Sequence, residues 1–180
     1  MSHERLKQDS VRAVLQSLGV SYTEPNESLF RFALGGLPSC LIRVRDQGVV
    51  FYVVHQNKVD VSHRKAMAEY IIRVNFALNF GNFEFNFADG QIRFKMSVQA
   101  AQASDIAAPL KSCLTLAQDV YPRWVPGFAL VQQGTSPDDA YRTCKTAMLP
   151  LTTGATISSQ PNVAELQALR DVIRGMDRAY

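Results

Sequence analysis

Two runs of alternating apolar and polar residues, separated by Asp89-Gly90, constrain the fold more than any other feature of the sequence. Residues 83–87 have phenylalanine at every second position, and residues 92–98 place Ile, Phe, Met and Val in the same way. Such alternation is typical of strands with one buried face, and an Asp-Gly pair between them favours a two-residue β-hairpin. That loop predicts one carboxylate–amine pair on the polar face, Glu84 opposite Lys95, and three apolar pairs: Phe87–Ile92, Phe85–Phe94 and Phe83–Met96.

Three more strands are predicted nearer the N-terminus, at residues 26–34, 39–45 and 49–55. The first alternates and is followed by Gly35-Gly36 and Pro38, so we expect it to be an edge of the sheet. The third is apolar on both faces, which predicts an interior strand covered on both sides.

Apolar residues with helical periodicity predict four helices, at residues 2–18, 62–80, 104–121 and 137–148. Gly19 and Gly81 would end the first two, and Ser62 and Ser136 would cap the second and fourth. Pro122 is expected to break or kink the chain after the third helix.

The predicted helix 62–80 is apolar on two sides. One side carries a continuous core stripe: Met67, Tyr70, Ile71, Val74, Ala77 and Leu78. The opposite side carries Ile72, Phe76 and Phe80, which a helix lying on a sheet would leave in water. We expect this second stripe to be a homodimer interface, and the alternative is that another helix of the same chain covers it.

The C-terminal part of the chain differs in composition from the rest. Residues 149–161 are rich in Thr, Ser, Gly and Pro and predict a flexible linker, and residues 162–178 have the pattern of an amphipathic helix. The predicted organisation is therefore a domain at 1–148, a linker at 149–161 and a C-terminal helix at 162–180, which could cover an apolar groove of the domain.

Several local motifs resemble the YbjN-type domain family, whose fold is similar to that of type III secretion chaperones. The matching stretches are structural motifs within residues 1–145: 18–22 (LGVSY), 68–75 (AEYIIRVN), 80–84 (FGNFE), 89–94 (DGQIRF) and 134–140 (GTSPDDA). The resemblance implies an α+β fold of order α-β-β-β-α-β-β-α with an antiparallel sheet, which dimerises and binds protein segments. Secretion chaperones tend to be acidic, whereas this chain has a net charge of +3.

The residues that catalysis would need are sparse, which favours a protein that is not an enzyme. The three histidines, His3, His55 and His63, have no metal-ligand spacing, and no phosphate-binding loop or nucleophile motif is present. Asp138-Asp139 is best explained as acids in the first turn of a helix. We therefore expect no catalytic residues, no metal and no cofactor.

Cysteine usage and charge bear on location and partners. Cys40, Cys113 and Cys144 are widely spaced, which favours a reducing compartment, and we expect a cytoplasmic protein. Cys40 and Cys113 are expected in the core and Cys144 partly exposed. A net charge of +3 does not demand nucleic acid or a membrane as partner.

The function expected from these observations is a non-enzymatic homodimer that binds a segment of another protein on a strand edge or in an apolar groove. The residues expected to contact that partner are aromatic: Phe30, Phe32, Trp124 and Phe128. The alternative is a binder of nucleic acid or of an acidic ligand, using the five basic residues that alternate with core positions: Arg31, Arg43, Arg45, Arg93 and Lys95. For this face the simpler interpretation, a solvent-exposed surface with Glu84 paired to Lys95, is favoured.

Overall fold

The computed structural model describes residues 3–147, so the predictions for 149–161 and 162–180 lie outside the described residues. Six antiparallel strands form one sheet in the order β1-β2-β3-β4-β6-β5. The strands are β1 (Tyr22–Asn26), β2 (Leu29–Leu34), β3 (Leu37–Arg45), β4 (Gly48–Val54), β5 (Asn82–Phe85) and β6 (Ile92–Gln99). The helices are α1 (His3–Ser17), α2 (Arg64–Ala77), α3 (Ala107–Gln132) and α4 (Pro137–Thr146), with 3-10 turns at Val61–His63 and Ala103–Asp105.

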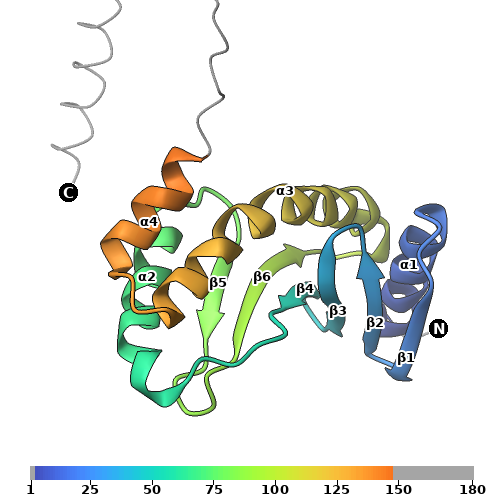
Figure 1. The fold of residues 1–180 in the computed structure, drawn as a ribbon. Helices are drawn as coiled ribbons and strands as arrows, with labels where there is room; N and C mark the ends of the chain where they lie inside the picture. The colour runs from blue at the N-terminus through green and yellow to red at the C-terminus, as the bar shows by residue number, and fades with distance from the viewer. Residues whose placement is uncertain (1–2, 148–180) are drawn as a thin grey trace, which may run out of the picture. The chain divides into compact units, whose positions relative to one another are not determined.

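The helices pack on one face of the sheet and at its β5 edge (Figure 1). α3 crosses that face, and its Tyr121 and Phe128 rings contact Phe83 of β5. α1 lies on the same face at the β1 end, where Arg12 stacks on the Phe30 ring. α2 lies beside β5, with α4 packed against both α2 and α3. The α+β fold class predicted from the sequence is therefore correct.

The sheet begins with a strand that the sequence did not reveal, which adds one strand to the predicted order. Residues 22–26 pair with β2, so β2 is an interior strand, and the prediction that it forms an edge is wrong. Alternation is weak in Tyr-Thr-Glu-Pro-Asn because the strand is mostly exposed. A turn stabilised by the Asn26 side chain, which accepts the backbone N–H of Ser28, joins the two strands.

The hairpin of β5 and β6 is present, but its register differs by two residues from the predicted one. Phe83 pairs with Phe94 and Phe85 with Ile92, and residues 86–91 form a longer loop. A two-residue type I′ turn would need Asp89 at positive φ, whereas only Gly90 adopts it. Because a shift of two preserves the faces of a strand, the apolar residues still point to the core.

Both central helices differ from their predicted limits. α2 starts after the 3-10 turn, Ser62 does not cap it, and it ends at Ala77 instead of residue 80. α3 continues through Pro122 and Pro126 to Gln132 as one helix. The two prolines are four residues apart, so the missing N–H groups lie on the same side of the helix, while the opposite side keeps its buried packing. The predictions that Gly19 ends α1 and that Ser136 caps α4 are confirmed.

Candidate functional site

Two apolar side chains on the outward side of α2, and a third in the loop after it, are exposed. Phe76 is 95% exposed, Ile72 is 68% exposed and Phe80 is 67% exposed. The opposite side of the helix packs Met67, Tyr70, Ile71 and Val74 into the core. Two apolar sides are therefore present in α2, but the predicted core stripe is shorter: Ala77 is exposed and Leu78 is half-buried, because the helix ends at Ala77. Nothing in residues 3–147 covers Ile72, Phe76 or Phe80. We call Ile72, Phe76 and Phe80 the outer α2 face.

Phe80 is exposed but is not part of α2. It lies beyond the helix, in the loop before β5. The Asn75 side chain joins the helix to the strand: its Oδ1 accepts the Phe83 N–H at 2.8 Å and its Nδ2 donates to the Phe83 carbonyl at 2.9 Å. Gly81, at φ +70°, completes the turn close to the Phe94 ring, where a side chain would collide. Asn75 was missed by the sequence analysis, because an asparagine within a predicted helix gives no signal of its partner.

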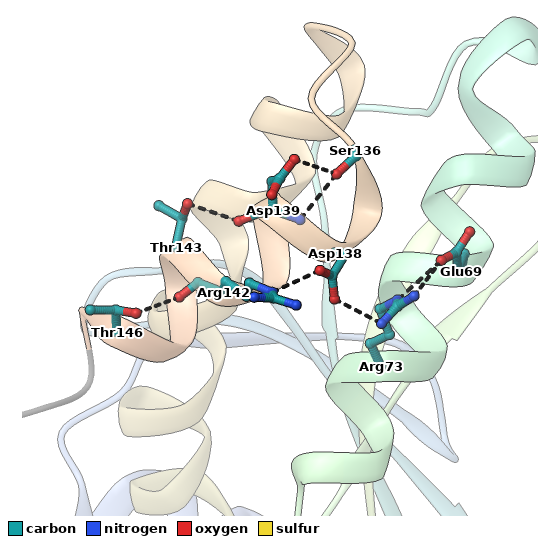
Figure 2. Close-up of polar contacts among 8 residues, drawn as sticks. All are labelled: Glu69, Arg73, Ser136, Asp138, Asp139, Arg142, Thr143 and Thr146. Atoms are coloured by element: carbon teal, nitrogen blue, oxygen red, sulfur yellow. Dashed lines mark hydrogen bonds and ion pairs between the residues drawn. The ribbon is translucent and has the colours of Figure 1, made fainter.

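A cluster of ion pairs lies along one flank of this face (Figure 2). Arg73 of α2 contacts Glu69 at 2.8 Å and Asp138 of α4 at 3.0 Å, and Asp138 also accepts from Arg142 at 2.7 Å. Asp139 instead belongs to the helix cap: its N–H donates to the Ser136 hydroxyl, which donates to its carboxylate. The acidic pair therefore starts α4 and attaches it to α2, as expected for acids in a first helical turn.

The four aromatic residues predicted to contact a partner are buried in the described domain. Phe30 and Phe32 point to the helix-covered face of the sheet, and Trp124 and Phe128 lie on the inward side of α3. Trp124 stacks on Tyr141 of α4 with ring centroids 5.6 Å apart. The prediction is corrected accordingly: these side chains fill the core, because α1 covers β2 and α3 is a continuous helix that turns them inward.

The other face of the sheet is open among the residues that the structure describes. The basic residues predicted to share it do so: Arg31, Arg43, Arg45, Arg93 and Lys95 are all exposed or half-buried. β4 is not covered on both sides as predicted, since its Val50, Tyr52 and Val54 are only half-buried on this face. We call this surface the open sheet face.

Glu84 neutralises one side of the open sheet face. Its carboxylate accepts from Arg93 at 2.6 Å and from Lys95 at 2.8 Å, so the predicted pairing with Lys95 is present despite the shifted register. Burial raises the pKa of Glu84, but the hydrogen bonds from Lys95 and Arg93 outweigh it and hold that pKa below its usual value. The Arg93 guanidinium also lies 4.5 Å above the centre of the Tyr52 ring.

A third feature is a cavity of about 330 Å³ between the end of β4 and the prolines of α3. Its lining includes the polar residues His55, Gln56, Asn57 and Tyr121 and the apolar residues Pro38, Pro122, Val125 and Pro126. The His55 Nδ1 lies 2.8 Å from the Tyr121 hydroxyl, and burial lowers the pKa of His55. The histidine is thus kept neutral and hydrogen-bonded to a neighbour.

The cysteines are core or near-core residues. Burial raises the pKa of Cys40 to about 12, which keeps the thiol protonated. Cys144 is buried, with its Sγ 3.5 Å from the Tyr70 hydroxyl oxygen, so the expectation of partial exposure is wrong. Cys113 is half-buried instead of fully in the core. Among residues 3–147, no three His, Cys, Asp or Glu side chains are grouped to hold a metal ion, and the absence of a metal stays a prediction.

Comparison with known proteins gives a similarity of fold. No family model matches the chain, and no curated protein matches it. A solved structure that it resembles is the crystal structure of YbjN from E. coli, described as "a putative transcription regulator". The two are 16% identical with a TM-score of 0.48, over 62% of this chain and 86% of that one. In the described part of the chain, no helix is both long and apolar enough to cross a bilayer.

Proposed function

We propose that this chain is a non-enzymatic, regulatory or adaptor-like module of the cytoplasm, which forms a homodimer and binds a segment of another protein. The observation that carries the proposal is the outer α2 face, with Ile72 and Phe76 exposed one helical turn apart and Phe80 exposed just beyond the helix. Burying a side chain of this size is worth about 1.5–3 kcal/mol, so a matching surface would gain substantially from covering all three.

A second copy of the chain supplies a matching surface without any further assumption. A row of apolar residues along one helix is self-complementary about a two-fold axis, because each copy places the same residues against the other. Glu69 and Arg73 lie on the flank of the row and carry opposite charges. In an antiparallel pair of α2 helices these side chains would reach the partner's opposite charges at the rim.

The surroundings of three titratable side chains, Tyr70, His55 and Asp138, support a non-catalytic role. The Tyr70 hydroxyl donates to the Trp124 carbonyl at 2.8 Å, and burial raises its pKa. His55 bonds Tyr121, and Asp138 bonds two arginines. Each of these groups thus has a structural partner inside the fold and none faces the outer α2 face as a free acid or base.

The test is the mass of the full chain in solution by light scattering, at concentrations from about 1 to 100 µM, which detects a dimer of micromolar Kd, worth about 8 kcal/mol. We expect twice the chain mass of 20.0 kDa for the wild type and the single mass for Phe76→Glu. Leu18→Glu is the matched control, since it places the same charge on an exposed apolar residue just after α1, which lies at the other end of the sheet. Circular dichroism checks that both variants are folded.

A wild-type chain that stays monomeric at the highest concentration would contradict the homodimer. If its signal with a dye for exposed apolar surface then rose on Leu166→Glu, the cover would be the predicted helix at 162–178. A Leu18→Glu variant that dissociates as readily as Phe76→Glu would also contradict the proposal, because the interface would not be specific to α2.

A further inference from the structure

The open sheet face has an apolar centre between two groups of cations. The centre consists of half-buried side chains on β3 and β4: Leu41, Val50, Tyr52 and Val54. The pairing registers join them across the sheet, Arg43 to Val50, Leu41 to Tyr52 to Lys95, and Val54 to Arg93. Arg31 on β2 lies next to Leu41 on the far side. The surface therefore runs from cations through aliphatic groups to cations.

The width of this surface suits an amphipathic segment. Neighbouring strands are about 4.8 Å apart, so Arg31 on β2 and Lys95 on β6, three strands apart, are separated by roughly 14 Å. A helix with its side chains is about 10–12 Å across. An apolar stripe of one helix could therefore rest on Leu41 and Tyr52 while its flanks reach the cations on both sides.

The charge of the face is only partly neutralised. Glu84 pairs with Arg93 and Lys95, at the β6 side. At the β2 and β3 side, Arg31, Arg43 and Arg45 have no carboxylate partner among the described residues; Arg31 and Arg45 are exposed and Arg43 is half-buried. Three cations in a row beside an apolar floor attract a ligand that carries carboxylates or phosphates.

Two occupants from the chain itself fit this charge poorly. A second copy would bring the same cations against one another, and like charges face to face are repulsive. Residues 148–180 carry three acids and three arginines, so that segment is neutral: Glu165, Asp171 and Asp177 against Arg170, Arg174 and Arg178. An external, acidic partner is the better complement.

We propose that the open sheet face binds an acidic amphipathic segment of another protein, with its apolar side chains on Leu41, Val50 and Tyr52 and its carboxylates on Arg31, Arg43 and Arg45. This inference rests on the proposed function in one respect, since it names the class of partner, but it does not need the dimer. A protein segment is favoured over nucleic acid because the floor is mainly aliphatic. Tyr52 is the one aromatic side chain that the pairing registers place among these residues, and Arg93 already stacks on its ring.

The probe is a fluorescein-labelled synthetic peptide of about 18 residues, or roughly five helical turns, with leucines along one side and glutamates elsewhere. Three comparison probes replace its glutamates by lysine, replace its leucines by serine, or use an oligouridine of the same length. Binding to the full chain is measured by anisotropy in about 150 mM salt, where distant surface charges are screened. We expect the acidic amphipathic peptide to bind at least about tenfold more tightly than each comparison probe.

The variant is Arg43→Glu with Arg45→Glu, and the matched control is Lys111→Glu with Arg123→Glu, which changes the net charge equally at exposed positions of α3. We expect the face variant to weaken binding at least about tenfold, equivalent to about 1.4 kcal/mol, and the control to change it less than about twofold. Tyr52→Thr, which replaces one residue that favours strands by another, should weaken binding of the leucine peptide and leave binding of the serine peptide unchanged.

Equal loss in the control variant would overturn the proposal, since binding would then follow net charge alone. Tighter binding of the oligouridine than of the peptide would reassign the open sheet face to nucleic acid. If the acidic peptide did not bind, the proposal would be rejected. Because Phe76→Glu leaves this face intact, peptide binding by that variant separates a failed dimer from a failed sheet face.

Discussion

Ile71 and Ile72 are the same residue at adjacent positions of α2, yet Ile71 is 4% exposed and Ile72 is 68% exposed. One residue advances a helix by 100°, which is enough to take the side chain from the core to the solvent-exposed side. Local helix propensity is equal at the two positions, so their difference lies entirely in what they contact. The apolar residues on the inner side of α2 are needed for the core of this domain. Those on the outer side have no partner among residues 3–147 that explains why they are apolar.

The most direct test of this difference between the two sides of α2 is to truncate each isoleucine in turn. Ile71→Ala should lower the free energy of unfolding by about 2–5 kcal/mol, because it leaves a cavity under the helix. Ile72→Ala should change the unfolding of the dilute, monomeric chain by less than about 0.5 kcal/mol. Chemical denaturation of both variants, at a concentration below dimer formation, measures the difference.

The same pair gives a second readout at high concentration. At high concentration Ile72→Ala should raise the Kd of the dimer. Ile71→Ala should leave that Kd unchanged once it is calculated from the concentration of folded chain. Comparable destabilisation by both substitutions in the dilute chain would mean that the outer side is already covered within one molecule, and the distinction between the two sides of α2 would be lost.

Asn75 tests whether the turn at the end of α2 contributes to stability and to the dimer interface. Its two hydrogen bonds to Phe83 fix the turn that contains Phe80. Each hydrogen bond is worth about 1 kcal/mol net, so Asn75→Ala should destabilise the chain by about 2 kcal/mol and also weaken the dimer. Asn57→Ala, on an exposed loop, is the control and should have little effect on either.

An Asn75→Ala variant with wild-type stability would show that the turn is held by Gly81 and the Phe94 ring alone. An Asn75→Ala variant that is less stable but dimerises normally would show that Phe80 contributes little to the interface, leaving Ile72 and Phe76 as its residues.

Features that depend on local chemistry could be predicted from the sequence. Ser136 caps α4 because its hydroxyl lies within reach of the next N–H groups, and Gly19 ends α1 because it tolerates positive φ. The buried and exposed positions of α2 up to Phe76 follow from helical geometry, whereas Ala77 is exposed and Phe80 lies beyond the helix. The exposure of the outer face was thus predicted before its environment was known, although the end of the helix was placed three residues too late.

Features that depend on distant partners could not be predicted in the same way. β1 is a strand because β2 offers it hydrogen bonds, and its own sequence is mostly exposed. The hairpin register is set by the loop at 86–91, where two side chains bond the backbone and prevent the tight turn. α3 continues through Pro122 because its buried aromatic side chains hold it on the sheet, which changes Trp124 and Phe128 from candidate anchors to core residues.

His55 provides a pH test of the inner side of α2. Tyr70 packs on Phe128, with centroids 5.8 Å apart, and Phe128 packs on His55 at 5.1 Å. Burial lowers the pKa of His55 below 6.5 in the folded chain, so at pH values under 6.5 the unfolded chain binds the proton more readily. Stability should therefore fall as the pH is lowered from about 7.5 towards 5.5, and His55→Gln, which does not titrate, should remove that part of the slope. Thermal unfolding across this pH range measures that slope.

An unchanged slope in His55→Gln would assign the titration to other groups. It would also show that the packing behind α2 tolerates a charged imidazole, so that this region is more accessible to water than its burial indicates.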